Sequence, residues 1–388
     1  MKPIKLLLVI ALMGTFSIAQ GLIIDHTSVD LFDQIPDQYL EAAAQLSTHY
    51  HTTSHGTQIL AGLKYIKEEL DAKYRAVWRT TYQSFPTPAS ALPSQTNPAS
   101  HRIGTTCVNP LADMYWHTAD GSAHIREYAA SGLYNFSMFH WCGELCVSTD
   151  LTANGYLEAY VDTLDQFEND YTDMRFIYTT SHLDGNSYSK VLLNNQYIRD
   201  YCINNDKVLL DLGDIEEYDS DGNYIGNTSA NCGWCQSYCE DNYSDCNNLP
   251  YACESGVDYC CAHAHGYNCY IKARAYWVMM AKLAGWGATN VKVKGKSEKA
   301  KIEINNYPNP IANSTRIMLK GLPVYLHGQR PLIKKYDLRG NLITQIQPDK
   351  ESLVYGINWN TDNIPAGIYL IKVNFQGMEY NKQVVVIK

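Results

Sequence analysis

Two copies of the tetrapeptide Thr-Thr-Ser-His, at residues 52–55 and 179–182, carry side chains that nucleophilic acyl transfer requires. Each copy follows a short apolar run and precedes a segment with helical periodicity. In an α/β fold this position is the carboxyl end of a strand, where ligands gather and where N–H groups at a helix start stabilise negative charge. Each serine is therefore a nucleophile or its support, or else a simple helix cap.

Further catalytic residue types follow the other predicted strands. If these strands are parallel, the loops at their carboxyl ends lie on one edge of the sheet. Five loops then bring together a serine, several histidines and several carboxylates: Ser54 and His55, Gly143 and Glu144, His182 and Asp184, Asp214 and Glu216, and finally Asp258, His263 and His265. These residue types favour acyl transfer at a serine hydroxyl.

Ser54 needs a base that accepts its proton. The adjacent His55 is a poor candidate, because neighbouring side chains at a strand–helix corner usually point apart. A histidine of the last loop, His263 or His265, could reach across to Ser54, and Asp258 or another loop carboxylate could orient its imidazole ring.

These residues are positioned by alternating strands and helices over residues 22–289. Short apolar runs predict strands at 45–50, 134–140, 175–179 and 208–212, and helical periodicity predicts helices at 57–74, 157–171, 189–203 and 268–283. This alternation indicates a parallel sheet with helices on both faces. The Pro-, Ser- and Ala-rich residues 85–100 indicate a surface loop.

The order of these blocks resembles the SGNH hydrolase superfamily of secreted esterases and carbohydrate deacetylases, which have a flavodoxin-like three-layer α/β/α fold. Ser54 takes the nucleophile's place, although the family's Gly-Asp-Ser reads Thr-Thr-Ser here. Gly143 takes the place of the glycine whose N–H helps to form the oxyanion hole. The family's third block contains an asparagine that is absent here, and His182 is the expected replacement.

The family's last block, Asp-x-x-His, is spaced differently in this chain. Asp258 precedes both His263 and His265, at longer spacings than the family's. His265 is preferred as the base, because Gly266-Tyr267-Asn268 leads directly into a helix as it does in the family. His263 is the close alternative.

The resemblance implies a secreted serine esterase that needs no cofactor and acts on polysaccharide or small ester substrates, such as acetyl groups on polysaccharides. His55, Glu144 and Asp184 are expected to line its pocket. Two alternatives stay open: a non-catalytic surface protein that binds glycans through its tyrosines and tryptophans on the same fold, and a metal-dependent hydrolase that uses His263, His265 and loop carboxylates.

The N-terminus and the cysteines indicate an exported protein. Lys2 and Lys5 precede an apolar stretch and the small-residue sequence Ser17-Ile18-Ala19, which predicts a signal peptide over residues 1–19. All twelve cysteines lie between Cys107 and Cys269, so up to six disulfides are expected. The net charge of −9 gives no reason to expect a nucleic-acid partner.

A cysteine-rich insertion over about residues 229–262 has two interpretations. Disulfides that staple the insertion are favoured over a structural zinc site at Cys232, Cys235 and nearby cysteines. The adjacent Cys260 and Cys261 would then bond to different partners. Residues 219–223 resemble part of a calcium loop, but they lack the distal glutamate and indicate a turn.

The composition changes after a basic linker over residues 290–302. Residues 303–388 lack cysteine and alternate apolar with polar residues, which predicts a small β-sandwich. Residues 306–310, 336–340 and 364–369 resemble the C-terminal sorting domain of type IX secretion. The resemblance implies recognition by the type IX secretion machinery, passage through the outer membrane and, often, attachment to the cell surface.

Overall fold

The computed structural model describes most of residues 21–287 and of residues 303–387. The described residues are 21–82, 84–94, 97, 99–146, 151, 154–184, 187–226, 231–254, 259–287, 303–320, 331–349, 352–353, 356–375 and 378–387. The predicted signal peptide, the predicted linker over residues 290–302 and Asp258 lie outside these ranges. No helix in the described ranges combines the length and the apolar character that crossing a membrane requires.

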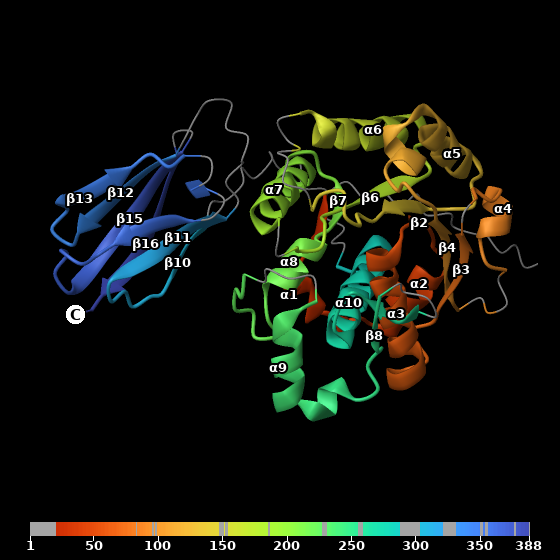
Figure 1. Cartoon of the computed structure of the whole chain (residues 1–388), viewed down its shortest axis with the longest axis horizontal. Coiled ribbons are helices and arrows are strands. Elements are labelled where there is room, and N and C mark those ends of the chain that lie inside the picture. Colours follow the sequence, from red (N-terminus) through yellow and green to blue (C-terminus); the bar gives the residue numbers. More distant parts are fainter. Residues whose placement is uncertain are drawn as a thin grey trace, which may run out of the picture.

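A seven-stranded parallel sheet runs through residues 21–287 (Figure 1). Its strand order is β1-β7-β6-β5-β2-β4-β3, and all neighbouring strands pair in parallel. The strands are β1 (Leu22–Ile24), β2 (Ser47–His51), β3 (Ala76–Tyr82), β4 (His101–Cys107), β5 (Phe136–Phe139), β6 (Arg175–Thr179) and β7 (Val208–Leu210).

Helices cover both faces of this sheet, as the alternation of strands and helices predicts (Figure 1). One face packs against α2 (Asp37–Ala44), α3 (Thr57–Tyr65) and α10 (Gly266–Leu283), and the other against α5 (Ala119–Ala130), α6 (Tyr156–Asp170) and α7 (Tyr188–Asn204). In β6, Phe176 and Tyr178 enter the core beneath α5, α6 and α7, whereas Ile177 enters the core beneath α10. This division follows from the alternation of side chains along a strand.

Shorter elements connect these layers. The helices are α1 (His26–Val29), α4 (Pro88–Ala91), α8 (Leu212–Glu217) and α9 (Gly233–Asp241), with short 3-10 or π-helical turns at Phe32–Gln34, Ser54–Gly56, Ile66–Leu70, Asp113–His117 and Tyr243–Cys246. Two-residue strands β8 (Ala252–Cys253) and β9 (Cys261–Ala262) form a separate small sheet.

The structure confirms the predicted flavodoxin-like sheet. Without the edge strands β1 and β3, the order β4-β2-β5-β6-β7 is the flavodoxin-like order 2-1-3-4-5. The four predicted strands correspond to β2, β5, β6 and β7. The sequence patterns missed β1, β3 and β4, because β1 has only three residues and the other two mix polar with apolar residues.

Two local predictions need correction. The helix predicted over residues 57–74 ends earlier: α3 stops at Tyr65, a π-helical turn follows to Leu70, and the backbone becomes extended at Asp71. Residues 85–100, predicted as a loop, contain the short helix α4, in which Ala91 is fully buried.

Four disulfides staple the cysteine-rich insertion to itself and to α10. They are Cys232–Cys235, Cys239–Cys246, Cys253–Cys260 and Cys261–Cys269. As predicted, the adjacent Cys260 and Cys261 have different partners. These bonds occupy all eight sulfurs of this region, which supports the staple over a zinc site there. The upper limit of six is not reached, because Cys107, Cys142, Cys146 and Cys202 are free thiols.

Residues 303–387 form two antiparallel sheets that share one core. The sheets have the orders β10-β11-β14 and β13-β12-β15-β16, with β10 (Glu303–Tyr307), β11 (Ser314–Lys320), β12 (Leu332–Asp337), β13 (Leu342–Ile346), β14 (Ile357–Asn360), β15 (Gly367–Phe375) and β16 (Met378–Val386). In β15, Ile371, Val373 and Phe375 are buried while the residues between them are partly exposed. This alternation is the pattern that predicted a sandwich.

Two fully buried histidines of the large sheet are neutral in the folded state. His51 Nδ1 lies 2.7 Å from Thr106 Oγ1, and His101 Nε2 lies 2.8 Å from the hydroxyl of Tyr276. Burial removes the water that would stabilise an imidazolium. It lowers the pKa of His51 to about 3 and that of His101 to about 4.

We predict that mild acid destabilises the α/β domain. Below pH 6.5 the unfolded chain binds protons at these histidines while the folded chain does not. The free energy of unfolding is therefore highest above pH 6.5 and decreases as the pH drops toward the pKa values of the folded state. Because of these two histidines, the unfolding free energy of the protein should decrease by about 2–3 kcal/mol between pH 7 and pH 5.5. Urea unfolding followed by near-UV circular dichroism measures this loss.

His51→Asn should reduce the loss by about 1 kcal/mol, because one titrating group is removed. His124→Asn, which changes a partly exposed histidine of α5, is the control and should leave the loss unchanged. Equal unfolding free energies of the wild type at pH 7 and pH 5.5 would contradict the prediction.

Lys335 of β12 is buried in the core of the sandwich. Its Nζ lies 5.0 Å from the centroid of the Trp359 ring, and among the described residues it has no hydrogen-bond acceptor. Desolvation lowers the pKa of Lys335 to about 8, so the group is still charged at pH 7 in the folded state. Above pH 8 the folded protein releases this proton before the unfolded chain does, so this group's contribution to stability improves as the pH rises.

Replacing Lys335 with Met should stabilise the sandwich by about 2 kcal/mol at pH 7, because the buried charge is removed. Hydrogen–deuterium exchange of the full chain should then slow in peptides from β12 and β15. Lys334→Met, on the opposite face of the same strand, is the control. Unchanged or faster exchange in Lys335→Met would show that the buried ammonium does not destabilise the sandwich.

Candidate functional site

The candidate site lies where the strand order of the large sheet reverses. The strands that follow β2 in the chain, β3 and β4, lie on one side of it, whereas β5 lies on the other. In open α/β sheets, ligands bind beyond the carboxyl ends of the strands at such a reversal. Ser54 follows β2, and Cys142 and Gly143 follow β5, so two of the predicted loops meet at this point.

Ser54 begins the tight turn that connects β2 to α3. A side chain at Gly56 is excluded, because its Cβ would lie 1.4 Å from Thr52 Oγ1. The cap residue of α3 is Gly56, and no side chain caps its first N–H groups. Ser54 Oγ instead contacts the thiol of Cys142 at 3.7 Å. The interpretation of Ser54 as a helix cap is therefore wrong.

The first Thr-Thr-Ser-His copy holds the free thiol of Cys142. In addition to the contact with Ser54, Cys142 Sγ lies 3.3 Å from His55 Nδ1. Both side chains thus reach the same sulfur, and the expectation that Ser54 and His55 point apart is wrong. The 3-10 turn brings both side chains against the loop after β5.

The second copy holds the free thiol of Cys146 in the same way. Cys146 Sγ lies 3.8 Å from Ser181 Oγ and 3.5 Å from His182 Nε2. The rings of His55 and His182 stack with their centroids 3.7 Å apart and their planes 6° from parallel. The repeated motif therefore forms two matching Ser–Cys–His arrangements that meet at the stacked rings.

Burial keeps these two histidines uncharged. Desolvation lowers the pKa of His55 to about 2 and the pKa of His182 well below its usual value. The neighbouring histidines and the ammonium of Lys272 lower both values further. Desolvation also raises the pKa of the Cys146 thiol to about 12. At neutral pH the site therefore contains neutral imidazoles beside a protonated thiol.

His263 lies beside the first copy. Its ring centroid is 4.6 Å from that of His55. Its φ of 58° lies in the left-handed region, which is uncommon for residues other than glycine and concentrates at functional sites. The disulfides Cys253–Cys260 and Cys261–Cys269 flank His263 and hold this conformation, and its N–H donates to the carbonyl of Cys253 at 2.7 Å.

Glu254 supplies a carboxylate to His263. The distance from His263 Nδ1 to Glu254 Oε2 is 3.6 Å, although the Glu254 side chain is almost fully exposed. The predicted orienting acid, Asp258, lies outside the described residues, so that assignment stays a prediction. Glu254 is therefore the described residue best placed to orient the imidazole of His263.

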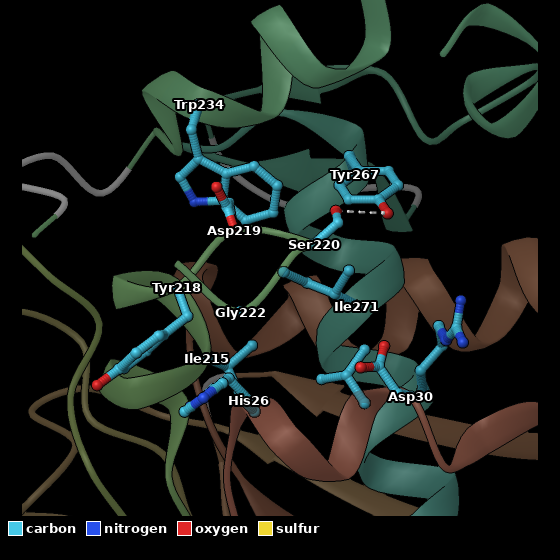
Figure 2. A pocket seen from close by; sticks show the side chains of 12 residues that line it. His26, Asp30, Ile215, Tyr218, Asp219, Ser220, Gly222, Trp234, Tyr267 and Ile271 are labelled. Atoms are coloured by element: carbon cyan, nitrogen blue, oxygen red, sulfur yellow. Dashed lines mark hydrogen bonds between the residues drawn. The ribbon is translucent and has the colours of Figure 1, made fainter. Parts of the chain in front are cut away.

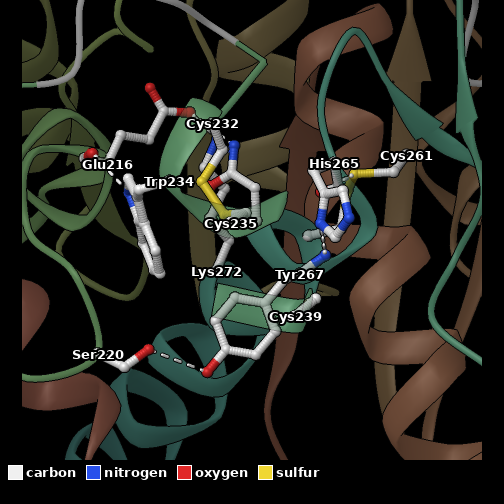
Figure 3. Close-up of a disulfide and its surroundings, with 12 residues drawn as sticks. Glu216, Ser220, Cys232, Trp234, Cys235, Cys239, Cys261, His265, Tyr267 and Lys272 are labelled. Atoms are coloured by element: carbon white, nitrogen blue, oxygen red, sulfur yellow. Dashed lines mark hydrogen bonds and ion pairs between the residues drawn. A yellow bond between two sulfur atoms is a disulfide. The ribbon is translucent and has the colours of Figure 1, made fainter. Parts of the chain in front are cut away.

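His265, the base preferred from the sequence, occupies a different position. Its Nδ1 accepts a hydrogen bond from the N–H of Tyr267 at 3.2 Å, so the ring caps the start of α10 (Figure 3). The described side-chain hydrogen bond of His265 thus belongs to the helix end and not to the histidines beside Ser54. Of the two candidates, His263 is the one whose ring contacts His55, the neighbour of Ser54.

The remaining predicted pocket residues lie on the loops after β5 and β6. Glu144 Oε2 accepts a hydrogen bond from the N–H of Cys142 at 2.7 Å, and burial raises the pKa of Glu144. The carbonyl of Gly143 accepts a hydrogen bond from the N–H of Cys146, which closes a turn between the two thiols. The charge of Asp184 contributes to the raised pKa of Cys146, so Asp184 lies near the second thiol.

A fully buried ion pair lies beneath this site. The ammonium of Lys272, on α10, lies 2.5 Å from Glu216 Oε1 and 2.5 Å from Gln58 Oε1. All three residues have no exposed surface. The pair is hydrogen-bonded on both sides, which a charge in such an environment requires.

This network fixes the loops that carry the site histidines. Glu216 Oε2 accepts a hydrogen bond at 2.7 Å from the N–H of Leu183, the residue after His182. Gln58 Nε2 donates a hydrogen bond at 2.5 Å to the carbonyl of Ala262, the residue before His263. The buried Lys272 thus connects the backbone next to His182 and next to His263 to α3, the helix that begins just after Ser54.

Sequence reasoning missed Cys142, Cys146, Glu254 and Lys272. The two cysteines were counted toward disulfides, although they lie far along the chain from the stapled insertion. Lys272 could have been recognised, because it is one helical turn from Asn268 and from Tyr276 on the buried face of α10. No sequence pattern identifies Glu254, because it lies next to His263 only once the insertion has folded.

The described residues around Ser54 do not form a cluster of possible metal ligands. Among the residues that the structure describes, the three potential ligands whose atoms lie within 4.8 Å of one another are Asp25, His26 and Asp214. Those side chains already pair with each other or cap α1. The predicted calcium-like segment is a turn, in which Asp219 accepts hydrogen bonds from the N–H groups of Asp221 and Asn223.

A small pocket opens between α1, α10 and the turn after α8 (Figure 2). Trp234, Tyr267, Ile215 and Ile271 line it, and none of the predicted site residues does. Its volume is about 50 Å³. A cavity that encloses a benzene ring has roughly 150 Å³, so this pocket is too small to enclose a sugar ring.

Comparison with protein families identifies the C-terminal part of the chain. Residues 290–388 match the secretion system C-terminal sorting domain, which confirms the predicted type IX sorting domain. The match indicates a protein that is secreted or lies at the cell surface, and it implies interaction with the type IX secretion machinery.

Other comparisons say little about the α/β domain. No curated protein is significantly similar to the chain. Similar solved structures include an endo-β-1,4-mannanase from Thermotoga petrophila, with 10% identity, a TM-score of 0.27, and coverage of 92% of this chain and 72% of that chain. An engineered protein matches with 10% identity, a TM-score of 0.22, and coverage of 95% of this chain and 99% of that chain. Likeness at these TM-scores carries no functional argument.

Breaking the buried pair should destabilise the α/β domain. Lys272→Met leaves the Glu216 carboxylate buried without its cation, and we expect a loss of about 3–5 kcal/mol of unfolding free energy. The double variant Lys272→Met, Glu216→Leu should lose less than the sum of its two single changes, because no charge is left unpaired.

Urea unfolding of the four proteins measures this coupling. Lys282→Met, which changes a partly exposed lysine of the same helix, is the control and should have little effect. Single variants within 1 kcal/mol of the wild type would show that the pair does not hold the loops together.

Proposed function

We propose that the α/β domain is a serine hydrolase of the SGNH type that cleaves ester bonds, with acetyl groups on polysaccharides as its substrate class. One observation carries this proposal. Ser54, which caps no helix, lies at the reversal of the strand order, and the strained His263 lies against its neighbour His55. The sorting domain would deliver this activity to the cell surface or to the surrounding medium.

In the proposed reaction, Ser54 Oγ attacks the carbonyl carbon of the ester while His263 accepts the hydroxyl proton. The Glu254 carboxylate, 3.6 Å from His263 Nδ1, stabilises the imidazolium that forms. His263 then gives its proton to the departing alcohol as the ester bond breaks. Water hydrolyses the acyl-serine with His263 again acting as the base, which releases the acid and restores Ser54.

The negative charge of the tetrahedral intermediate needs hydrogen-bond donors. The backbone N–H groups of Ser54 and Gly143 are the proposed main-chain donors, because their loops meet at the carboxyl edge of β2 and β5. His182 is the proposed side-chain donor. Its loop is held by Glu216, and its imidazole is kept neutral by burial and by the charge of Lys272.

A cysteine hydrolase is the second candidate. It is favoured by the contact of 3.3 Å between Cys142 Sγ and His55 Nδ1, which is the arrangement of a nucleophile and its base. The lowered pKa of His55 opposes it, because this imidazole resists the proton that a thiolate would have to give up. Ser54 therefore remains the first choice.

A fluorophosphonate probe tests the proposal on the full exported chain. We expect one adduct, on Ser54, that is absent from Ser54→Ala and present in Cys142→Ala. His263→Ala should slow labelling by roughly 100-fold or more, because the base is lost. His265→Asn is the matched control, since Asn can also cap α10, and it should label at nearly the wild-type rate.

The other outcomes distinguish the alternatives. Labelling that persists in Ser54→Ala but vanishes in Cys142→Ala would replace the serine by the cysteine as nucleophile. If the folded wild type is not labelled at all, and Ser54→Ala binds acetylated polysaccharide as well as the wild type does, the chain is a glycan-binding protein and not an enzyme.

A further inference from the structure

We propose that Cys146 sets the tautomer of His182, so that His182 carries its proton on Nδ1 and offers this N–H group to the oxyanion. The role of His182 as a hydrogen-bond donor to the oxyanion rests on the proposed function. The tautomer itself does not, and it can be measured in a protein without any activity.

Cys146 Sγ lies 3.5 Å from His182 Nε2. One proton lies between these atoms, either on the sulfur or on the nitrogen. A neutral imidazole nitrogen is a good acceptor, whereas sulfur is a weak one. Ser181 Oγ, 3.8 Å from the same sulfur, can donate its own proton to it. The thiol therefore donates to Nε2, and the ring proton must be on Nδ1.

The charge states of the two groups agree with this assignment. Burial keeps the Cys146 thiol protonated, with its pKa raised to about 12, so it has a proton to donate. Burial and the charge of Lys272 hold the pKa of His182 well below its usual value, so the ring carries only one proton. A doubly protonated ring, which could not accept from the thiol, is excluded at neutral pH.

His182 Nδ1 is the atom that makes this tautomer consequential. It is buried, and among the described residues it has no hydrogen-bond partner. A buried donor without a partner is destabilising and calls for a functional explanation. Nδ1–H would attract an oxyanion, whereas a lone pair at Nδ1 would repel it. Because protein atoms cover Nδ1 in the free chain, the substrate has to displace them as it binds.

The other copy of the motif provides an internal comparison. There the thiol of Cys142 contacts the opposite nitrogen, His55 Nδ1, at 3.3 Å. The same reasoning gives His55 the tautomer with its proton on Nε2. The two histidines of the repeated tetrapeptide should therefore carry opposite tautomers, which no common solvent effect would produce.

Two-bond ¹H–¹⁵N NMR spectra of the full chain, labelled at histidine, measure both tautomers at pH 7. His182→Gln and His55→Gln assign the signals by their loss. We expect Nδ1–H for His182 and Nε2–H for His55. Cys146→Ser, which keeps a donor, should preserve the His182 tautomer, and Cys146→Ala should lose the preference. Cys142→Ala is the matched control and should leave His182 unchanged.

The proposal is overturned if His182 carries its proton on Nε2 in the wild type, or if Cys146→Ala keeps the full Nδ1–H preference. Ester hydrolysis then tests the role of the donor. Cys146→Ala should lower kcat by roughly 10- to 100-fold with little change in KM, and Cys146→Ser should restore it. A wild type with the expected tautomers but no turnover would overturn the oxyanion role together with the proposed function, and leave the tautomer assignment standing.

Discussion

The buried charge of Lys272 is the constraint on which the rest of the α/β domain depends. A cation without access to water must be surrounded by acceptors, and Glu216 and Gln58 supply them from two different elements. Each acceptor side chain also hydrogen-bonds a backbone group, Glu216 at Leu183 and Gln58 at Ala262. Satisfying one ammonium therefore determines where the loops around His182 and His263 lie. Desolvation lowers the pKa of His55, His140 and His182, and the charge of Lys272 lowers these values further.

The duplicated tetrapeptide places one local sequence at two different positions of the sheet. Both copies lie at the carboxyl end of a strand of the same parallel sheet. Each copy places a serine and a histidine against a different thiol of the loop after β5, Cys142 for the first copy and Cys146 for the second. The first copy lies next to the reversal of the strand order, which is where ligands bind in open α/β sheets. The second lies one strand further away and contributes a ring that stacks on the first. In the proposed function, the difference between nucleophile and support therefore comes from the sheet order and not from the motif.

The fold was largely predictable from the sequence, because apolar runs and helical periodicity report burial directly. The strand at residues 175–179 was predicted to the residue, and the sorting domain was recognised from three short segments. The candidate site was harder to predict from the sequence. Asp258 and His265 were favoured by their order in the chain, whereas Glu254 contacts His263 only because two disulfides fold the insertion back on itself. The free thiols of Cys142 and Cys146 were difficult to predict because the even cysteine count suggests full pairing, and only their distance along the chain from the stapled insertion sets them apart.

The central claim is that Ser54 at the reversal of the sheet is the nucleophile of an esterase. Acetate release from acetylated polysaccharide, measured with the purified full chain, tests it most directly. The account predicts steady release by the wild type and a loss of at least roughly 1,000-fold in Ser54→Ala, with the variant folded as judged by circular dichroism. Equal release by both proteins, or none by the folded wild type on any acetylated polysaccharide tested, would contradict it.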